Sequence, residues 1–169
     1  MEIRRAEPQD IEAVLPLFVS YREFYKRETD VAKAMGFLSD NLELGKSVIF
    51  VAYDEFAKAV GFAQLYLQVS SLSMSTYIYL SDLFVDSQLR SKGIGKELLK
   101  AVNDYGTAIG AKSIQLETAV SNVQAQKLYE SCGYKWDKEF RTYVFDKAVA
   151  PATAIKPVRP VAVEPGFKS

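Results

Sequence analysis

Hydrophobic residues recur at helical spacing in four parts of the chain. In residues 11–25 they return every three or four positions, which predicts an amphipathic helix with an aromatic last turn. A second, weaker helix is expected over residues 31–41, with Gly45 after its end. The same spacing returns between Gly93 and Gly110 and again in residues 121–133. The pattern therefore predicts about four helices.

Segments rich in β-branched and aromatic residues lie between these helices and predict strands. They are expected over residues 3–6, 47–53, 60–70, 77–85, 113–120, 134–136 and 140–145. The turn-like residues 54–58 make a hairpin of the second and third strands, whereas the strand–helix–strand order after residue 77 implies parallel pairing. The chain is predicted to have an α/β fold, with a central mixed sheet of about seven strands flanked by about four helices.

The last part of the sequence differs from the rest. Residues 147–169 hold four of the six prolines and hardly an aromatic residue. We therefore divide the chain into a domain of residues 1–146 and a proline-containing C-terminal arm of residues 147–169. Such an arm is either disordered or docked, and its valines at 158, 161 and 163 would suit a neighbouring subunit. We expect a homodimer or higher oligomer, with the arm at the interface as a hypothesis.

Composition excludes several classes of function. The chain has 21 basic and 21 acidic side chains, so its overall charge favours neither nucleic acid nor an anionic membrane. It has no histidine, which excludes imidazole-based triads and metal sites, and its only cysteine, Cys132, suits a reducing compartment. No apolar run approaches the ~20 residues of a membrane helix. We expect a cytoplasmic protein without a metal.

The residues DSQLRSKGIGKELL, at 86–99, stand between a predicted strand and a predicted helix. Unpaired N–H groups and the helix dipole favour a diphosphate at a helix start, and Gly93 and Gly95 would let it approach closely. Three basic residues add local positive charge: Arg90, Lys92 and Lys96. Arg90 stands where a Walker loop needs glycine, and Leu98 stands where the dinucleotide fingerprint does. Both of those motifs are therefore excluded.

The remaining pattern, Arg-x-x-Gly-x-Gly from Arg90 to Gly95, resembles the acyl-coenzyme A loop of the GNAT superfamily of N-acetyltransferases. The flanking stretches YIYLSDLFV, IQLETAVSN and AQKLYESCGY strengthen the resemblance, with Asn122 and Tyr129 seven residues apart as in that superfamily. The stretches VGFAQLY, IYLSDLFV and RSKGIG look most like the diamine and polyamine acetyltransferase branch. The resemblance implies that a neutral amine attacks the thioester of acetyl-CoA directly, with both substrates bound together.

The resemblance also implies roles for particular residues. The loop amides would hold the diphosphate of acetyl-CoA, while the preceding strand end and Asn122 would hold the pantetheine arm. The implied cofactor-binding residues are Leu83, Phe84, Val85, Arg90, Ser91, Lys92, Gly93, Ile94, Gly95, Lys96, Asn122 and Tyr129. Tyr129, with an ordinary pKa near ~10, would give a proton to the departing thiolate. Phe24 and Tyr25 would contact the acceptor, although an aromatic helix face is equally typical of a core.

The expected base is where the sequence departs from the diamine branch. Those enzymes carry an acidic pair in the strand before the loop, whereas this chain has Ser81 followed by Asp82. Asp82 would accept a proton directly, act through a water chain, or orient a cationic amine; a purely structural role is the alternative. Glu117 is a further candidate beside the acceptor. The implied catalytic residues are thus Tyr129 and Asp82, and the acceptor-binding residues are Phe24, Tyr25, Ser81, Asp82 and Glu117.

Three functions follow from these residues. The expected one is acetylation of a primary amine of a small molecule, such as a polyamine, a diamine or an amino acid. A protein lysine or N-terminus is the alternative acceptor. The missing acid at Ser81 also leaves open a non-catalytic acyl-CoA sensor.

Overall fold

The computed structural model describes residues 1–144, so the arm at 147–169 lies outside the described residues. Residues 1–135 form one compact unit, and a second unit begins at Trp136. The elements are β1 (Glu2–Arg5), the 3-10 helix η1 (Pro8–Asp10), α1 (Ile11–Phe24), α2 (Val31–Glu43), β2 (Val48–Tyr53), β3 (Ala59–Ser70), β4 (Ser75–Val85), the 3-10 helix η2 (Ser87–Leu89), α3 (Ile94–Ala108), β5 (Ile114–Gln115) and α4 (Val123–Ser131). None of the helices within residues 1–144 is long and apolar enough to cross a membrane.

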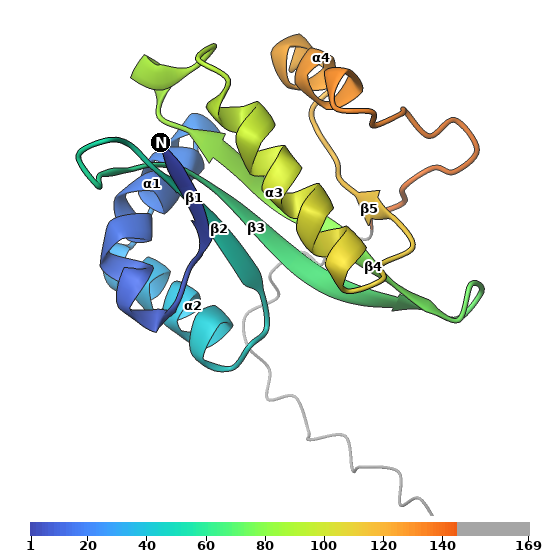
Figure 1. Ribbon diagram of the computed structural model, residues 1–169, viewed down its shortest axis with the longest axis horizontal. Coiled ribbons are helices and arrows are strands. Elements are labelled where there is room, and N and C mark those ends of the chain that lie inside the picture. Colours follow the sequence, from blue (N-terminus) through green and yellow to red (C-terminus); the bar gives the residue numbers. More distant parts are fainter. Residues whose placement is uncertain (145–169) are drawn as a thin grey trace, which may run out of the picture. The chain divides into compact units, whose positions relative to one another are not determined.

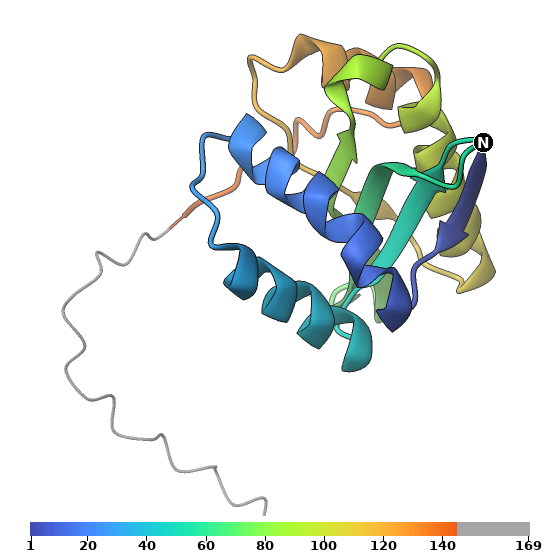
Figure 2. The ribbon, with the colours of Figure 1, turned by 90° about the vertical axis from the view of Figure 1, so that its left-hand side faces the viewer.

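The five strands form one mixed sheet in chain order, β1-β2-β3-β4-β5. The first four are antiparallel, and β5 pairs with β4 in parallel. Helices α1 and α2 cover one face of the sheet and α3 covers the other (Figures 1 and 2). The α/β class, the mixed sheet and the four helices are confirmed.

The prediction of about seven strands is wrong, because the described residues hold five. The strand expected over 113–120 pairs with β4 only at Ile114 and Gln115, so it offers little edge to a further strand. In the strand expected over residues 134–136, the Tyr134 hydroxyl donates to the Asn103 side chain of α3, at 2.8 Å. In the second unit, the Asp137 side chain accepts the backbone N–H groups of residues 139 and 140. These local turns satisfy amides that a strand would need.

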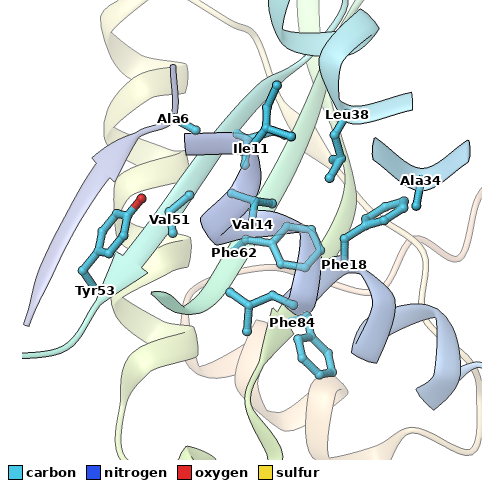
Figure 3. Close-up of a cluster of buried hydrophobic side chains, with 12 residues drawn as sticks. Ala6, Ile11, Val14, Phe18, Ala34, Leu38, Val51, Tyr53, Phe62 and Phe84 are labelled. Atoms are coloured by element: carbon cyan, nitrogen blue, oxygen red, sulfur yellow. The ribbon is translucent and has the colours of Figure 1, made fainter. Parts of the chain in front are cut away.

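Two apolar clusters lie on opposite faces of the sheet. One joins α1 and α2 to β2 and β3, and Val14, Leu38 and Phe62 are fully buried in it (Figure 3). The other joins α3 to the opposite face. Since neighbouring strand residues point to opposite faces, the near-continuous apolar run of β3 is explained by burial of both faces.

A β-bulge interrupts the alternation of β4. Asp82 pairs with Gln64, and Leu80 pairs with the next residue of β3, so Ser81 is an extra residue in β4. Before the bulge, even-numbered residues such as Leu80 pack with α3; after it, the even-numbered Phe84 packs with α1. A bulge redirects the side chains that follow it. It therefore places Asp82 on the α1 face of the sheet, beside Gln64.

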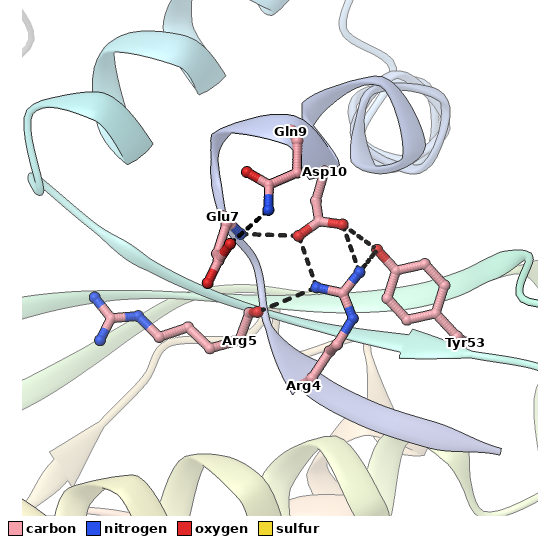
Figure 4. A network of polar contacts seen from close by, with 6 residues as sticks. All are labelled: Arg4, Arg5, Glu7, Gln9, Asp10 and Tyr53. Carbon is pink, nitrogen blue, oxygen red and sulfur yellow. Dashed lines mark hydrogen bonds and ion pairs between the residues drawn. The ribbon is translucent and has the colours of Figure 1, made fainter.

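An ion pair ties β1 to the start of α1 (Figure 4). The Arg4 guanidinium donates to both carboxylate oxygens of Asp10, at 2.7 and 2.6 Å. Asp10 also accepts the Tyr53 hydroxyl at 3.0 Å and the Glu7 backbone N–H at 2.9 Å. The hydrogen bond from Arg4 is the main cause that lowers the pKa of Asp10 to about 2.

Replacement of Asp10 by asparagine is expected to lower the free energy of unfolding at neutral pH by roughly 1 to 3 kcal/mol, because charge-assisted hydrogen bonds are lost. Since folding lowers the pKa of Asp10 from 3.8 to about 2, the stabilisation is present above pH 3.8 and is lost as the pH falls towards 2. Urea unfolding at pH 7 and at low pH measures both effects. The exposed Glu12→Gln change is the control, and equal effects of the two substitutions would contradict the prediction.

Candidate active site

A cavity of about 260 Å³ opens at the carboxyl end of β4. Four elements and one loop enclose it: β4, the loop after it, and helices α1, α3 and α4. Thirteen of its lining residues are those implied by the sequence: Leu83, Phe84, Val85, Arg90, Ser91, Gly93, Ile94, Gly95, Lys96, Asn122, Tyr129, Phe24 and Tyr25. Most of the residues implied for the cofactor thus meet two of the five implied for the acceptor, Phe24 and Tyr25, in one cavity.

The loop before α3 presents its backbone to this cavity. Ser91 and Gly93 have positive φ angles of 64° and 86°, and Gly93 is the N-cap of α3. No acceptor within residues 1–144 takes the N–H groups of residues 91–95, whereas the Lys96 N–H donates to Gly93 O at 3.0 Å. Successive unpaired N–H groups at a helix start form an anion site.

Gly95 lets α4 approach the start of α3. A β-carbon built at Gly95 would come within 3.0 Å of the Leu128 side chain. The absence of a side chain at Gly95 therefore sets the spacing of two cavity walls. This is a packing reason for the second glycine of the motif, separate from access to a diphosphate.

The Arg90 side chain lines the cavity and contacts two aromatic rings. Its guanidinium is 5.0 Å from the centre of the Phe24 ring and 5.5 Å from that of Phe84. Its Nε donates to the backbone oxygen of Val85 at 3.2 Å. These contacts connect the end of β4 to the last turn of α1, a role that the motif alone does not indicate.

On α4, Asn122 and Tyr129 both face the cavity. The Asn122 side-chain oxygen accepts the Ala125 N–H at 3.3 Å, so the residue is an N-cap and keeps its amide hydrogens for other partners. The Tyr129 ring is partly buried, and burial, followed by interaction with Tyr25, raises the pKa of Tyr129 to about 12. Tyr129 therefore stays protonated and is available as a donor at neutral pH.

Asp82 lies behind the cavity wall and does not line the cavity itself. Burial raises the pKa of Asp82, while interactions with the hydroxyls of Tyr21 and Ser81 act in the opposite direction. Tyr21 does line the cavity, and its ring packs against Phe84. Asp82 thus interacts with a residue of the cavity wall without being part of that wall.

A fully buried carboxamide lies next to Asp82 in the ladder. Gln64 donates to Ser47 Oγ and to the Tyr66 hydroxyl, each at 3.0 Å, and its Oε1 has no hydrogen-bond partner among residues 1–144. Burial, with the charge of Asp82, raises the pKa of Tyr66 to about 12. The surroundings of Asp82 on this face are therefore polar but uncharged.

Some implied residues lie outside the cavity, and other residues enter it. Lys92, Ser81 and Glu117 do not line it. Glu117 instead acts on Tyr79, where its charge adds to burial in raising the pKa of that hydroxyl. Lining residues that the sequence analysis did not assign are Tyr21, Leu89, Gln124, Ala125 and Leu128. Helical spacing offers a signal for two of them, since Tyr21 is one turn before Tyr25 and Ala125 one turn before Tyr129.

Comparison with known proteins identifies the class. Residues 12–134 match the Acetyltransferase (GNAT) family, so the chain belongs to this family and is an acetyltransferase. It is 44% identical over 143 residues to an uncharacterized N-acetyltransferase, YhfO, of Bacillus subtilis, covering 85% of this chain and 95% of the relative. It is 29% identical over 140 residues to the D-amino-acid N-acetyltransferase HPA3 of Saccharomyces cerevisiae, covering 80% and 86%. A crystal structure described as a probable acetyltransferase superposes with a TM-score of 0.83 at 34% identity, covering 88% of this chain and 99% of that one.

Proposed function

We propose that the protein transfers the acetyl group of acetyl-CoA to the primary amine of a small molecule, by direct attack while both substrates are bound. The observation that supports this is a single cavity bounded by the loop amides, by Tyr129 and by the aromatic end of α1. Substrates held together in one cavity gain on the order of 7 to 11 kcal/mol from proximity and orientation. A diamine or polyamine as acceptor, and a cytoplasmic location, stay predictions.

The residues present fit acetyl-CoA. The unpaired N–H groups of residues 91–95 and the side chain of Lys96 would hold the diphosphate, and the Asn122 amide would hold the pantetheine arm. Because Arg90 donates to Val85 O, this side chain must move if the Val85 backbone is to bind a pantetheine amide. When bound, acetyl-CoA supplies the activated acetyl group.

Two tyrosines that line the cavity would move protons in the reaction. Tyr129 would donate a proton to the departing sulfur, because its raised pKa keeps the hydroxyl protonated at neutral pH. Tyr21 would accept a hydrogen bond from the incoming amine and pass its proton to Asp82. This assignment replaces direct contact between Asp82 and the amine, since Tyr21 and not Asp82 lines the cavity.

The acceptor side of the cavity is aromatic. Tyr25 packs edge-on against both Phe24 and Tyr21, with ring centres 5.1 and 5.2 Å away. Aromatic faces bind apolar chains and cations. The yeast relative is a D-amino-acid N-acetyltransferase, which also favours a small acceptor over a protein.

An amine panel tests this function. The protein is incubated with acetyl-CoA and with diamines, polyamines, D- and L-amino acids or a lysine-containing peptide, and release of free thiol is measured. Turnover with a small amine supports the proposal. Turnover with the peptide alone favours the protein acceptor, and calorimetric binding of acetyl-CoA without turnover favours the sensor.

Replacement of Gly93 by alanine is expected to weaken CoA binding about 5- to 30-fold. A left-handed residue with a β-carbon costs roughly 1 to 2 kcal/mol, and a loop that avoids this cost leaves the conformation that presents its N–H groups. Isothermal titration with CoA measures the loss. Gly110→Ala is the matched control, since Gly110 also has a positive φ, of 69°, with open space around it. We expect weaker CoA binding only in Gly93→Ala, and equal affinities of the two variants would contradict the prediction.

A further inference from the structure

The hairpin of β3 and β4 extends past the rest of the sheet (Figure 1) and has an unusual surface. No charged residue occurs from Ala59 to Ser81. Within this stretch Leu67, Val69, Leu72 and Met74 are 49%, 80%, 93% and 89% exposed. Apolar side chains exposed together in this way mark interaction sites in soluble proteins.

Within residues 1–144, one edge of this hairpin is also unpaired. The ladder between β2 and β3 ends where Val48 meets Leu65. Residues 66–70 of β3 pair with β4 on one side, and on the other side no backbone hydrogen bond joins them to any residue in 1–144. The free edge is therefore about five residues long.

Proteins usually protect such an edge with lysine, proline, or a covering segment, because unpaired backbone groups attract another strand. This edge has no charge and no proline. Leu67 and Val69 lie on the same face of the sheet, the one that α3 covers, because Leu67 pairs with the buried Ile78 of that cluster. Backbone and side chains together fit an antiparallel strand with apolar residues at alternate positions.

We propose that this edge pairs with the same edge of a second copy of the chain, antiparallel and centred on Gln68. A two-fold axis through Gln68 uses the whole free edge, since it pairs residue 66 with residue 70 of the other copy. It also sets Leu67 of each copy opposite Val69 of the other. A charged edge would repel its own copy across such an axis, whereas this one has no charge to repel.

The same arrangement brings two further exposed apolar residues close to each other. Continued past residue 70, the turn of one copy reaches the start of β2 in the other. Leu72 at that turn and Leu44 just before β2 are 93% and 66% exposed. Contact between them would extend the interface beyond the strand edge, towards the area that a stable dimer needs.

The mass of the full-length chain in solution, measured by light scattering during gel filtration, tests the proposal. We expect twice the 18.9 kDa of one chain, and a shift to a single chain in Val69→Lys, which sets new charges near the axis. Phe56→Lys is the matched control, because Phe56 is 83% exposed and lies outside the hairpin edge. Circular dichroism and thermal unfolding of each variant show whether it is folded.

A cross-link tests the register and does not depend on the fold of Val69→Lys. In a Cys132→Ser background, Gln68→Cys is expected to form a disulfide between copies under mild oxidation, because directly opposed strand residues have Cα atoms about 4.5–5.5 Å apart. Phe56→Cys, in the same background, is expected to form no disulfide between copies. A monomeric wild type, or a dimer that Val69→Lys leaves intact and Gln68→Cys does not cross-link, would overturn the proposal. Neither result bears on the acetyltransferase assays.

Discussion

Replacement of Tyr129 by phenylalanine is expected to lower kcat by roughly 10²- to 10⁴-fold, the usual contribution of a general acid. The hydroxyl is the group lost, while the ring still fills its place beside Tyr134, 6.0 Å between ring centres. Because the pKa of Tyr129 is raised to about 12, the wild-type residue remains protonated throughout the working pH range. Affinity for CoA is expected to stay close to that of the wild type, so that the defect appears in kcat.

The matched control for this substitution is Tyr134→Phe. Burial also raises the pKa of Tyr134 to about 12, but its hydroxyl donates to Asn103 and the residue does not line the cavity. Its loss is expected to reduce thermal stability and to leave kcat within a few-fold of the wild type. Steady-state kinetics with calorimetric CoA binding measures both variants. An unchanged kcat in Tyr129→Phe would remove the proposed proton donor.

Replacement of Asp82 by asparagine is expected to change activity and stability in opposite directions. Activity falls by roughly 10²-fold or more if the carboxylate takes the proton passed by Tyr21. Stability at neutral pH rises, since burial raises the pKa of Asp82 and the ionised form is therefore costly in the folded protein. Kinetics and thermal unfolding of one preparation measure the two effects.

The pH dependence of stability shows the direction in which ionisation of Asp82 acts. The folded state binds the Asp82 proton more tightly than the unfolded state, so stability from this residue is greatest at low pH and is lost as the pH rises through the folded pKa. In contrast, kcat/KM of the wild type is expected to rise with pH through the same range, as the base becomes ionised. Asp104→Asn, at an exposed position on α3, is the control. An Asp82→Asn enzyme with full activity and an unshifted pH profile would exclude both active roles of the carboxylate.

The spacing of hydrophobic residues along the chain was sufficient to predict the helices of this fold. Residues 11–25 and 93–110 show helical spacing because one face of each helix packs on the sheet, and the observed α1 and α3 lie within one or two residues of these bounds. The last strands were predicted in error because a strand depends on its neighbour as well as on its own sequence. The short β5 offers little edge, and the Asp137 side chain satisfies nearby amides instead.

The candidate site could be predicted where its residues follow one another at fixed spacing. The loop from Arg90 to Gly95 is contiguous, and Asn122 and Tyr129 are two helical turns apart on α4, so sequence alone brings each group to one face. The position of Asp82 could not be predicted. It depends on a bulge in β4, which becomes visible only in the register with β3.

This bulge reverses the alternation of side chains along β4. Upstream of Ser81, odd-numbered positions such as Tyr79 share the α1 side of the sheet, whereas downstream even-numbered positions do so. Without the bulge, Ser81 would pair with Gln64 and Asp82 with Ala63, which would point the Asp82 carboxylate into the aliphatic cluster beneath α3. One irregular position in β4 therefore decides whether this carboxylate stands beside Tyr21 or in the core beneath α3.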